Sequence, residues 1–272
     1  NWDADIDYIN RLSKINRNLV NLEKNLNDKR YPYYEPKILK DGGIIFQGAS
    51  PLIKIDKCST FEWQIDELFH HSTEFVDENT VWTSIREVPG KFKEIHENYH
   101  DDIIAKINLE NQKILFQKSI TEILIENNLG YLLDYSYIAY DPIHVNDVQP
   151  VLRDTDYFKK GDLFLSLRTI STILLFRPST NEVLWHKTSP MIMQHDINIL
   201  NDHSITLFNN NNLIHDKNNS LVPLSEIIVF DFKINQFLRP YRKIFEDLNV
   251  RTLVGSKGKI IKNIMYVWDF DN

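Results

Sequence analysis

The chain has 272 residues, of which 42% are hydrophobic and 25% are charged, and its formal net charge is −7. This composition is typical of a globular protein with a substantial core. The acidic balance argues against nucleic acid as a partner, because surfaces that bind phosphate backbones are basic. Cys58 is the single cysteine, which excludes an intrachain disulfide. No run of about 18 apolar residues occurs, so the sequence predicts no membrane-spanning helix.

The first segment has apolar residues at steps of three and four, which predicts an amphipathic helix from Asp3 to Asp28. Asp3 or Asp5 could cap its start. We expect this helix to pack on the main domain. Its polar face carries charges of both signs, which argues against membrane binding, so docking to a protein partner or to a second copy is the alternative. The predicted division is an N-terminal helix over residues 1–30 and a β domain over residues 31–272.

Four segments of the β domain align as repeats, each with three short strands separated by turns, and the third strand carries an aromatic residue. A further strand precedes the second, third and fourth repeats and opens with His71, His144 and His195. Four antiparallel strands per repeat are typical of a β-propeller blade, so the predicted fold is an all-β propeller with an N-terminal helix. A fifth blade is expected to begin near Arg251, and the natural protein is expected to continue beyond Asn272.

The first strand of each propeller blade lines the central channel, so the three histidines are expected to meet at its mouth. Three histidines can bind a metal, bind an oxyanion, carry out nucleophilic and acid–base chemistry, or be structural. Arg168 and Asn146 accompany them, and Arg86 falls in the same aligned column as Arg168. A fixed cation disfavours a metal ion and favours an anion. We therefore expect chemistry directed at an anion, without a metal.

Each of these assignments has a plainer alternative. A slip of one residue in the strand register would exchange His71 with its neighbour His70. Arg168 and Arg86 could pair with carboxylates within the blades. The four asparagines from Asn209 are expected to form only a loop.

Three stretches in a fixed order resemble the bacterial arylsulfotransferases and their relatives. They read H-V-N-D-V-Q-P from His144, G-D-L-F-L-S-L-R up to Arg168, and Q-H-D-I-N-I-L-N from Gln194. The resemblance is strongest from Asp134 to Asn212. It implies a propeller that is often six-bladed, and an enzyme that moves a sulfuryl group from an aryl sulfate to a phenol through a sulfated histidine. The reaction has ping-pong order and needs neither a nucleotide sulfate donor nor another cofactor.

On the matching positions, the resemblance makes His195 the nucleophile and Arg168 the group that neutralises the sulfuryl oxygens. It makes His144 and Asn146 the residues that orient and bind these oxygens. His71 would be a further channel histidine that assists proton transfer to the phenol. The small-molecule partners are then an aryl sulfate and a phenol.

Arg86 is a candidate for substrate binding because it shares the column of Arg168. The resemblance also implies export to the periplasm, with membrane anchoring through a segment not present in this sequence. The main alternative function is a non-catalytic propeller that binds a protein partner or an anionic ligand. A quinone-dependent dehydrogenase is disfavoured, because the sequence shows no set of carboxylates suited to calcium.

Overall fold

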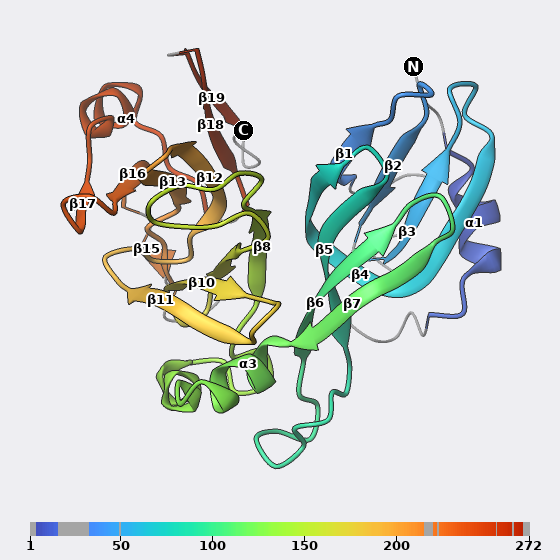
Figure 1. Cartoon of the computed structure of the whole chain (residues 1–272), viewed down its shortest axis with the longest axis horizontal. Coiled ribbons are helices and arrows are strands. Elements are labelled where there is room, and N and C mark those ends of the chain that lie inside the picture. The colour runs from blue at the N-terminus through green and yellow to red at the C-terminus, as the bar shows by residue number, and fades with distance from the viewer. Residues whose placement is uncertain are drawn as a thin grey trace. The chain divides into compact units, whose positions relative to one another are not determined.

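The computed structural model describes residues 4–15, 33–48, 50–214, 220–221, 223–253, 255–262 and 264–268 (Figure 1). The chain divides into two compact units. Unit 1 contains Asn1–Glu122 and Ala139–Asp141, and unit 2 contains Ile123–Ile138 and Pro142–Asn272. No helix in the described part of the chain combines the length and the apolar character that crossing a membrane requires.

Unit 1 is built on one seven-stranded antiparallel sheet in the order β1-β2-β3-β4-β5-β6-β7. Its fourth strand, β4 (Phe61–Asp77), is 17 residues long; its first half pairs with β3 and its second half with β5. Two four-stranded meanders therefore share this strand, where the sequence predicted two separate strands. The other strands are β1 (Tyr34–Ile38), β2 (Ile44–Gln47), β3 (Ser50–Ile55), β5 (Thr80–Glu87), β6 (Asp101–Asn108) and β7 (Lys113–Ser119).

The N-terminal helix α1 (Ile6–Leu12) packs on unit 1. The Asp5 side chain accepts a 2.8 Å hydrogen bond from the Tyr8 amide, as predicted for a cap. The helix ends at Leu12, because Ser13 adopts extended backbone and its hydroxyl donates to Asp66 at 2.7 Å. The observed helix therefore ends well before Asp28, where the predicted helix ended. Residues 16–28 of the predicted helix lie outside the described residues. The apolar face of the helix meets the first strands through Ala4, Ile6, Ile9, Phe46, Ile53 and Ile55.

Unit 2 contains two four-stranded antiparallel sheets, in the orders β11-β10-β9-β8 and β12-β13-β16-β17. This meander is the arrangement of a β-propeller blade, which confirms the predicted fold class. β12 contacts both β8 and β9 of the neighbouring sheet, and β18 contacts β12 and β13. The strands of the two sheets are β8 (Val145–Pro150), β9 (Leu163–Leu167), β10 (Thr172–Arg177), β11 (Glu182–Thr188), β12 (His195–Asn201), β13 (Ser204–Asn209), β16 (Glu226–Asp231) and β17 (Gln236–Leu238).

Short elements complete unit 2 and the connection to it. α3 (Ile120–Glu126) contains the boundary between the units, and the 3-10 helix η2 (Gly130–Tyr135) follows it. The remaining elements are the hairpin strands β14 (Leu213–Ile214) and β15 (Ser220–Leu221), helix α4 (Arg242–Leu248), and the final hairpin of β18 (Lys257–Ile261) and β19 (Ile264–Trp268).

The core of unit 2 lies between its two sheets. Trp185 of β11 packs against Phe230 of β16 with ring centroids 4.7 Å apart, and Phe237 of β17 also contacts Phe230 at 4.9 Å. Both Trp185 and Phe237 are the aromatic residues predicted in the third strand of a repeat. Both are partly buried and pack against the core of unit 2, which gives the sheets the rigidity that a site at the start of the first strands needs.

Candidate functional site

His195 begins β12 and is held by two hydrogen bonds at one ring nitrogen. Its Nδ1 lies 2.7 Å from Asn210 Oδ1 and 2.9 Å from the Met193 carbonyl oxygen, and the residue is only 7% exposed. Both partners are acceptors, so Nδ1 carries the hydrogen. The lone pair of the neutral ring is therefore on Nε2, which is the nitrogen available for nucleophilic attack.

The orientation of Asn210 is fixed by the hydrogen bonds that its side-chain NH₂ group donates to main-chain carbonyls. Its Nδ2 donates to the Gly255 carbonyl at 2.9 Å and to the Thr252 carbonyl at 3.3 Å. These partners can only accept, so Oδ1 must be the atom that faces His195. The main chain near residue 255 thereby determines, through one buried amide, which nitrogen of His195 is protonated.

The charge state of His195 follows from its surroundings. Burial and then the positive charge of Arg168 lower the pKa of the ring to about 4, against the opposing effect of the Asn210 and Met193 hydrogen bonds. The imidazole is therefore neutral at neutral pH. A neutral, desolvated imidazole beside a fixed cation is suited to attack an anionic substrate.

The residue before His195 is anchored by the neighbouring sheet. The Gln194 side chain donates to the carbonyls of Leu167 and Thr172 at 3.0 and 3.1 Å, and the main-chain carbonyl of Gln194 accepts from Asn146 Nδ2 at 2.8 Å. Asn146 thus uses an N–H group to position the backbone next to His195. The predicted role of Asn146, binding sulfuryl oxygens, rests on its other N–H group.

His144 and Arg168 are neighbours across the edge of the sheet formed by β8 and β9. The Arg168 amide donates to the His144 carbonyl at 3.1 Å, and both side chains are partly buried. Arg168 also lies near enough to His195 to lower its pKa. Unit 2 therefore brings together four of the predicted residues: His195, Arg168, His144 and Asn146.

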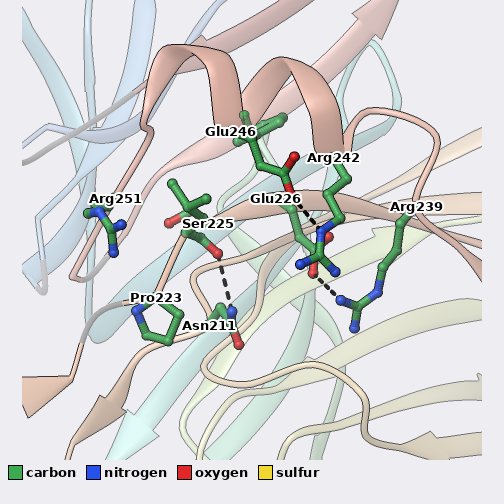
Figure 2. A pocket seen from close by; sticks show the side chains of 10 residues that line it. Asn211, Pro223, Ser225, Glu226, Arg239, Arg242, Glu246 and Arg251 are labelled. Carbon is green, nitrogen blue, oxygen red and sulfur yellow. Dashed lines mark hydrogen bonds and ion pairs between the residues drawn. The ribbon is translucent and has the colours of Figure 1, made fainter.

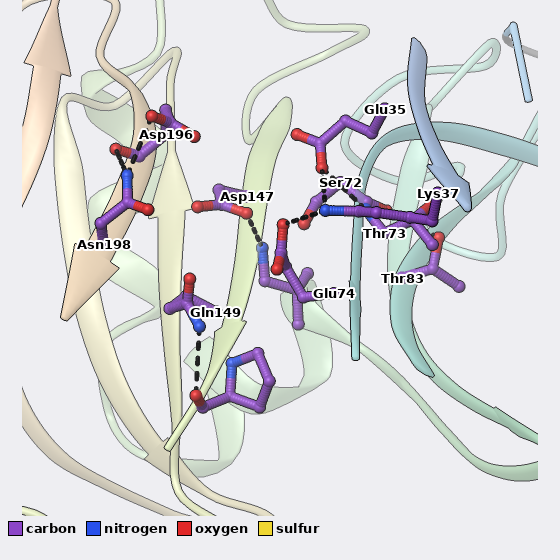
Figure 3. Close-up of polar contacts among 12 residues, drawn as sticks. Glu35, Lys37, Ser72, Thr73, Glu74, Thr83, Asp147, Gln149, Asp196 and Asn198 are labelled. Carbon is purple, nitrogen blue, oxygen red and sulfur yellow. Dashed lines mark hydrogen bonds and ion pairs between the residues drawn. The ribbon is translucent and has the colours of Figure 1, made fainter. Parts of the chain in front are cut away.

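The segment after His195 is tied to β8 and to the last hairpin. Asp147 accepts from the Val148 and Ile197 amides at 2.8 and 2.7 Å. Asp196 accepts from the Gly258 amide at 3.0 Å and from Asn198 Nδ2 at 2.9 Å. Figure 3 shows Asp147 and the contact between Asp196 and Asn198 at the start of these strands. Both carboxylates therefore hold backbone and side-chain amides of the site in place.

His71 and Arg86, the other two predicted site residues, belong to unit 1. Arg86 is 9% exposed, and its guanidinium lies 2.9 Å from Asp102 and 3.3 Å from Asp141. Burial alone would raise the pKa of Asp102, but Arg86 and His70 hold it well below its usual range. Two carboxylates balance the charge of Arg86. This geometry favours a structural role for Arg86, the pairing with carboxylates within a blade, and disfavours substrate binding.

The strand register resolves which histidine of unit 1 corresponds to His195. His70 pairs with Ser84, and His195 pairs with Phe208. Ser84 and Phe208 share a column of the repeat alignment, two positions before the column of Arg86 and Arg168. The residue that follows each histidine has left-handed backbone, with φ of 55° at His71 and 52° at Asp196. By this criterion His70, and not His71, occupies the place of His195. His71 is the more exposed of the two.

The sequence motifs do not assign Asn210 or Gln194 to the site. Residues 210–212 lie outside the strands, as predicted for a loop, and Asn209, Asn210 and Asn212 are all buried. One signal was present, because Asn210 falls in the same column of the repeat alignment as Arg168 and Arg86. Within the described residues, no three histidine, cysteine or carboxylate side chains are grouped so that they could hold a metal ion.

Unit 2 has a cavity of about 360 Å³ on the chain segments that carry Arg168 and His195. Its lining includes Thr169, which follows Arg168, and Met193, whose carbonyl holds His195. Tyr135 and Tyr137 form part of its wall, and the Tyr137 hydroxyl donates to Met193 Sδ at 3.4 Å. This lining suits an aromatic ring.

A second cavity, of about 290 Å³, lies beside α4 (Figure 2). Arg239 lies 3.1 Å from Glu226, and Arg242 lies 2.9 Å from Glu246. Ion pairs thus occupy two of the arginines that line this cavity, and none of the described residues in its lining is a histidine.

The chain matches the model of the arylsulfotransferase (ASST) family over residues 35–260, which is well over half of its length. The chain belongs to the arylsulfotransferase family. This finding confirms the resemblance carried by the motifs around His144, Arg168 and His195. The comparison with curated proteins found no match.

Solved structures similar to this arylsulfotransferase-family chain share little sequence with it. A protein of unknown function from Bacteroides caccae has a TM-score of 0.55 at 10% identity, with 91% of this chain and 79% of that chain covered. The Neurospora crassa Pan2 WD40 domain has a TM-score of 0.46 at 9% identity, with 77% of this chain covered. The present chain spans 51% of the Pan2 chain. The first of these similarities concerns the fold alone.

In this arylsulfotransferase-family chain, we expect Asn210→Ala to reduce sulfuryl transfer by roughly 10²–10⁴-fold, because the loss of one of the two acceptors at Nδ1 favours the Nε2–H tautomer of His195. Asn210→Asp keeps an acceptor for Nδ1–H and adds a negative charge, so it should raise the pKa of His195. It also loses the two donations to the carbonyls of Thr252 and Gly255, so its activity should lie between those of Asn210→Ala and the wild type. Rates against pH for both variants check this. Asn211→Ala, the neighbouring asparagine, is the control. Full activity in Asn210→Ala would show that the tautomer is set by other contacts.

The depressed pKa of His195 should also appear in stability. An unfolded histidine has a pKa near 6.5 and the folded one a pKa of about 4, so the unfolded chain binds more protons between these values. Stability contributed by neutral His195 is therefore complete above about pH 6.5 and is lost as pH falls toward 4. Between pH 7 and pH 5 the loss is about 2 kcal/mol. Urea unfolding at both pH values, compared with a His195→Asn variant, measures it, and an equal pH effect in both proteins would contradict it.

Proposed function

We propose that this chain transfers a sulfuryl group from an aryl sulfate to a phenol through a sulfated His195. The observation that carries the proposal is the geometry of this one ring in a chain of the arylsulfotransferase family. The ring is buried and neutral, its Nδ1–H is held by two acceptors, and the charge of Arg168 lies close to it.

In the first step Nε2 of His195 forms a bond to sulfur while the bond between sulfur and the aryl oxygen breaks. The electron pair of that bond leaves with the aryl oxide, which becomes a phenol on protonation. Arg168 balances the charge on the sulfuryl oxygens as the bond exchange proceeds. His144 lies beside Arg168 and is proposed to contact the same oxygens.

The sulfated ring carries a positive charge, because Nδ1 keeps its hydrogen. The acceptors Asn210 and Met193 stabilise that charge, whereas burial and Arg168 oppose it. The balance makes the neutral ring a good leaving group. In the second step the oxygen of a phenol attacks sulfur, its proton is lost to a base, and the bond between sulfur and Nε2 returns its electrons to His195. Splitting the transfer in this way gives ping-pong kinetics.

The part played by His71 stays a prediction of the family resemblance. A histidine base that removes the proton of the acceptor phenol fits the second step. The role assigned to Asn146 is more limited, because it donates to the Gln194 carbonyl and so positions the backbone beside the nucleophile.

The experiment that tests the proposal is intact mass of the whole chain after mixing with excess aryl sulfate. We expect a gain of one sulfuryl group, released again when a phenol is added. The release must yield the corresponding aryl sulfate. No gain in mass together with no liberated phenol would overturn the transfer mechanism and favour a propeller that binds an anionic ligand or a protein.

The cavity beside Met193 is the proposed site for an aryl ring. We expect Tyr137→Ala to raise the KM for the aryl sulfate about fivefold, since aromatic contacts contribute about 1 kcal/mol beyond area burial. Tyr137→Phe keeps the ring and serves as the matched control, with a KM close to that of the wild type. Steady-state rates over a range of donor concentrations measure both. An unchanged KM in the alanine variant would place the ring elsewhere.

A further inference from the structure

His71 is held in one orientation by contacts around the whole residue. Its backbone is left-handed, with φ of 55°, in the middle of β4. Gln47 Nε2 donates to its carbonyl at 2.7 Å, and its ring is stacked on Tyr34 with centroids 6.0 Å apart and planes inclined by 6°. A left-handed conformation is unfavourable for a histidine and persists only where its surroundings enforce it, which is common at functional sites. A register shift in β4 at this point turns the side chain.

The neighbouring His70 is buried against a carboxylate. Its Nε2 lies 3.1 Å from Asp102 Oδ1, in a bent arrangement, and Arg86 Nε lies 2.9 Å from the same oxygen. The Arg86 charge and the His70 ring hold the pKa of Asp102 below its usual range, although burial opposes them, so Asp102 is ionised. An ionised carboxylate can only accept hydrogen bonds. The hydrogen of a neutral His70 must therefore be on Nε2.

His70 has no second hydrogen to donate. Burial and then the Arg86 charge lower its pKa, so the ring is neutral and carries one N–H group. Its Nδ1 is then an acceptor. This Nδ1 lies 2.8 Å from His71 Nδ1, and two lone pairs at that distance would repel each other. His71 Nδ1 must carry the hydrogen that lies between the two rings.

We infer that Asp102 and His70 are positioning residues that hold His71 in the Nδ1–H tautomer and so make its Nε2 the basic nitrogen. The hydrogen between the rings then belongs to His71 Nδ1 and is directed at His70 Nδ1, and the hydrogen of His70 is on Nε2, which faces Asp102 Oδ1 at 3.1 Å. The carboxylate of Asp102 thus determines which nitrogen of His70 is protonated, and His70 in turn determines which nitrogen of His71 is protonated. The inference rests on the proposed function and deepens it, because it specifies the basic nitrogen of the histidine for which the family resemblance predicts a role in proton transfer.

The wild-type chain tests the inference without any substitution. Long-range proton–nitrogen NMR on the whole chain labelled with ¹⁵N-histidine distinguishes protonated from unprotonated ring nitrogens. The two residues are assigned from spectra of His71→Gln and His70→Asn. We expect His71 to show a protonated Nδ1 and an unprotonated Nε2, and His70 to show the opposite pattern. A protonated Nε2 on neutral His71 would overturn the inference.

A matched pair of variants tests the part played by His70. His70→Asn can place its amide oxygen near the position of Nδ1, so it keeps an acceptor for His71 and should preserve the Nδ1–H tautomer. His70→Leu removes the acceptor, and the Nε2–H tautomer of His71 should then appear. If a variant unfolds because the site is buried, the tautomer of His71 is still decided by the spectrum of the wild-type chain. Retention of the wild-type tautomer in folded His70→Leu would show that another contact sets it.

Kinetics separate this inference from the proposed function. If His71 shows the expected tautomer but sulfated His195 in His71→Gln reacts with phenol at the wild-type rate, the relay stands and the catalytic role of His71 fails. If the wild-type chain gains no sulfuryl group, the proposed function fails and the NMR result is unaffected. A tenfold or larger loss of the phenol step in both His71→Gln and His70→Leu, with partial recovery in His70→Asn, supports both together.

Discussion

Replacing His195 by asparagine is expected to abolish sulfuryl transfer, with a loss of about 10⁴-fold or more. The asparagine amide can occupy the position of Nδ1 and donate to Asn210 and Met193 as the ring does. It has no atom at the position of Nε2, so no bond to sulfur can form. The variant therefore removes the nucleophile while keeping the local hydrogen bonds.

Three measurements check this result: the release of phenol from an aryl sulfate, the intact mass, and the midpoint of thermal unfolding. His186→Asn, on β11 of the same unit, is the control for loss of a histidine away from the site and should keep the wild-type rate. Transfer by His195→Asn within tenfold of the wild type would show that another residue carries the sulfuryl group.

Replacing Arg168 by methionine is expected to lower transfer by about 10²–10³-fold, the usual effect of removing one group that stabilises charge on the transferring oxygens. Methionine keeps an apolar stem of similar length and removes only the guanidinium. The same change removes one of the two causes of the low pKa of His195, so that pKa should rise while burial keeps it below its ordinary value.

The two effects of Arg168→Met are measured together in the pH dependence of the first step, followed as the burst of phenol release. Arg168→Lys should recover part of the rate, because it restores the charge but not the planar, two-pronged donor geometry. Arg153→Met, at an exposed arginine paired with Asp202, is the control and should leave the rate unchanged. A wild-type burst in Arg168→Met would remove Arg168 from the mechanism.

The strands of both units were predictable because short apolar segments alternate with turns and recur as repeats. One of these apolar segments is β10 (Thr172–Arg177), where Ile173 and Leu175 meet the core of unit 2. The double role of β4 was not predictable. Nothing in the pattern of residues Phe61–Asp77 marks the point where one meander ends and the next begins, since both halves are extended.

The site was predictable only where a motif specifies a residue type. The motifs identified His195 and Arg168, whose chemistry depends on their own side chains. The partners of Arg86 were not predictable, because Asp102 becomes its neighbour through strand pairing between β5 and β6 and Asp141 follows far along the chain. The distinction between His70 and His71 depends on a register shift, and a change of one residue in register exchanges the faces of a strand.

The orientation of His195 depends on Asn210, and the orientation of Asn210 depends in turn on the main-chain carbonyls of residues 252 and 255. A contact made by carbonyl oxygens does not depend on the side chains of the residues that supply them. The contact therefore constrains the path of the backbone, which at Gly255 is left-handed, with φ of 72°, a conformation that favours glycine. Selection would act here on the shape of the main chain, at residues whose side chains take no part in the candidate site.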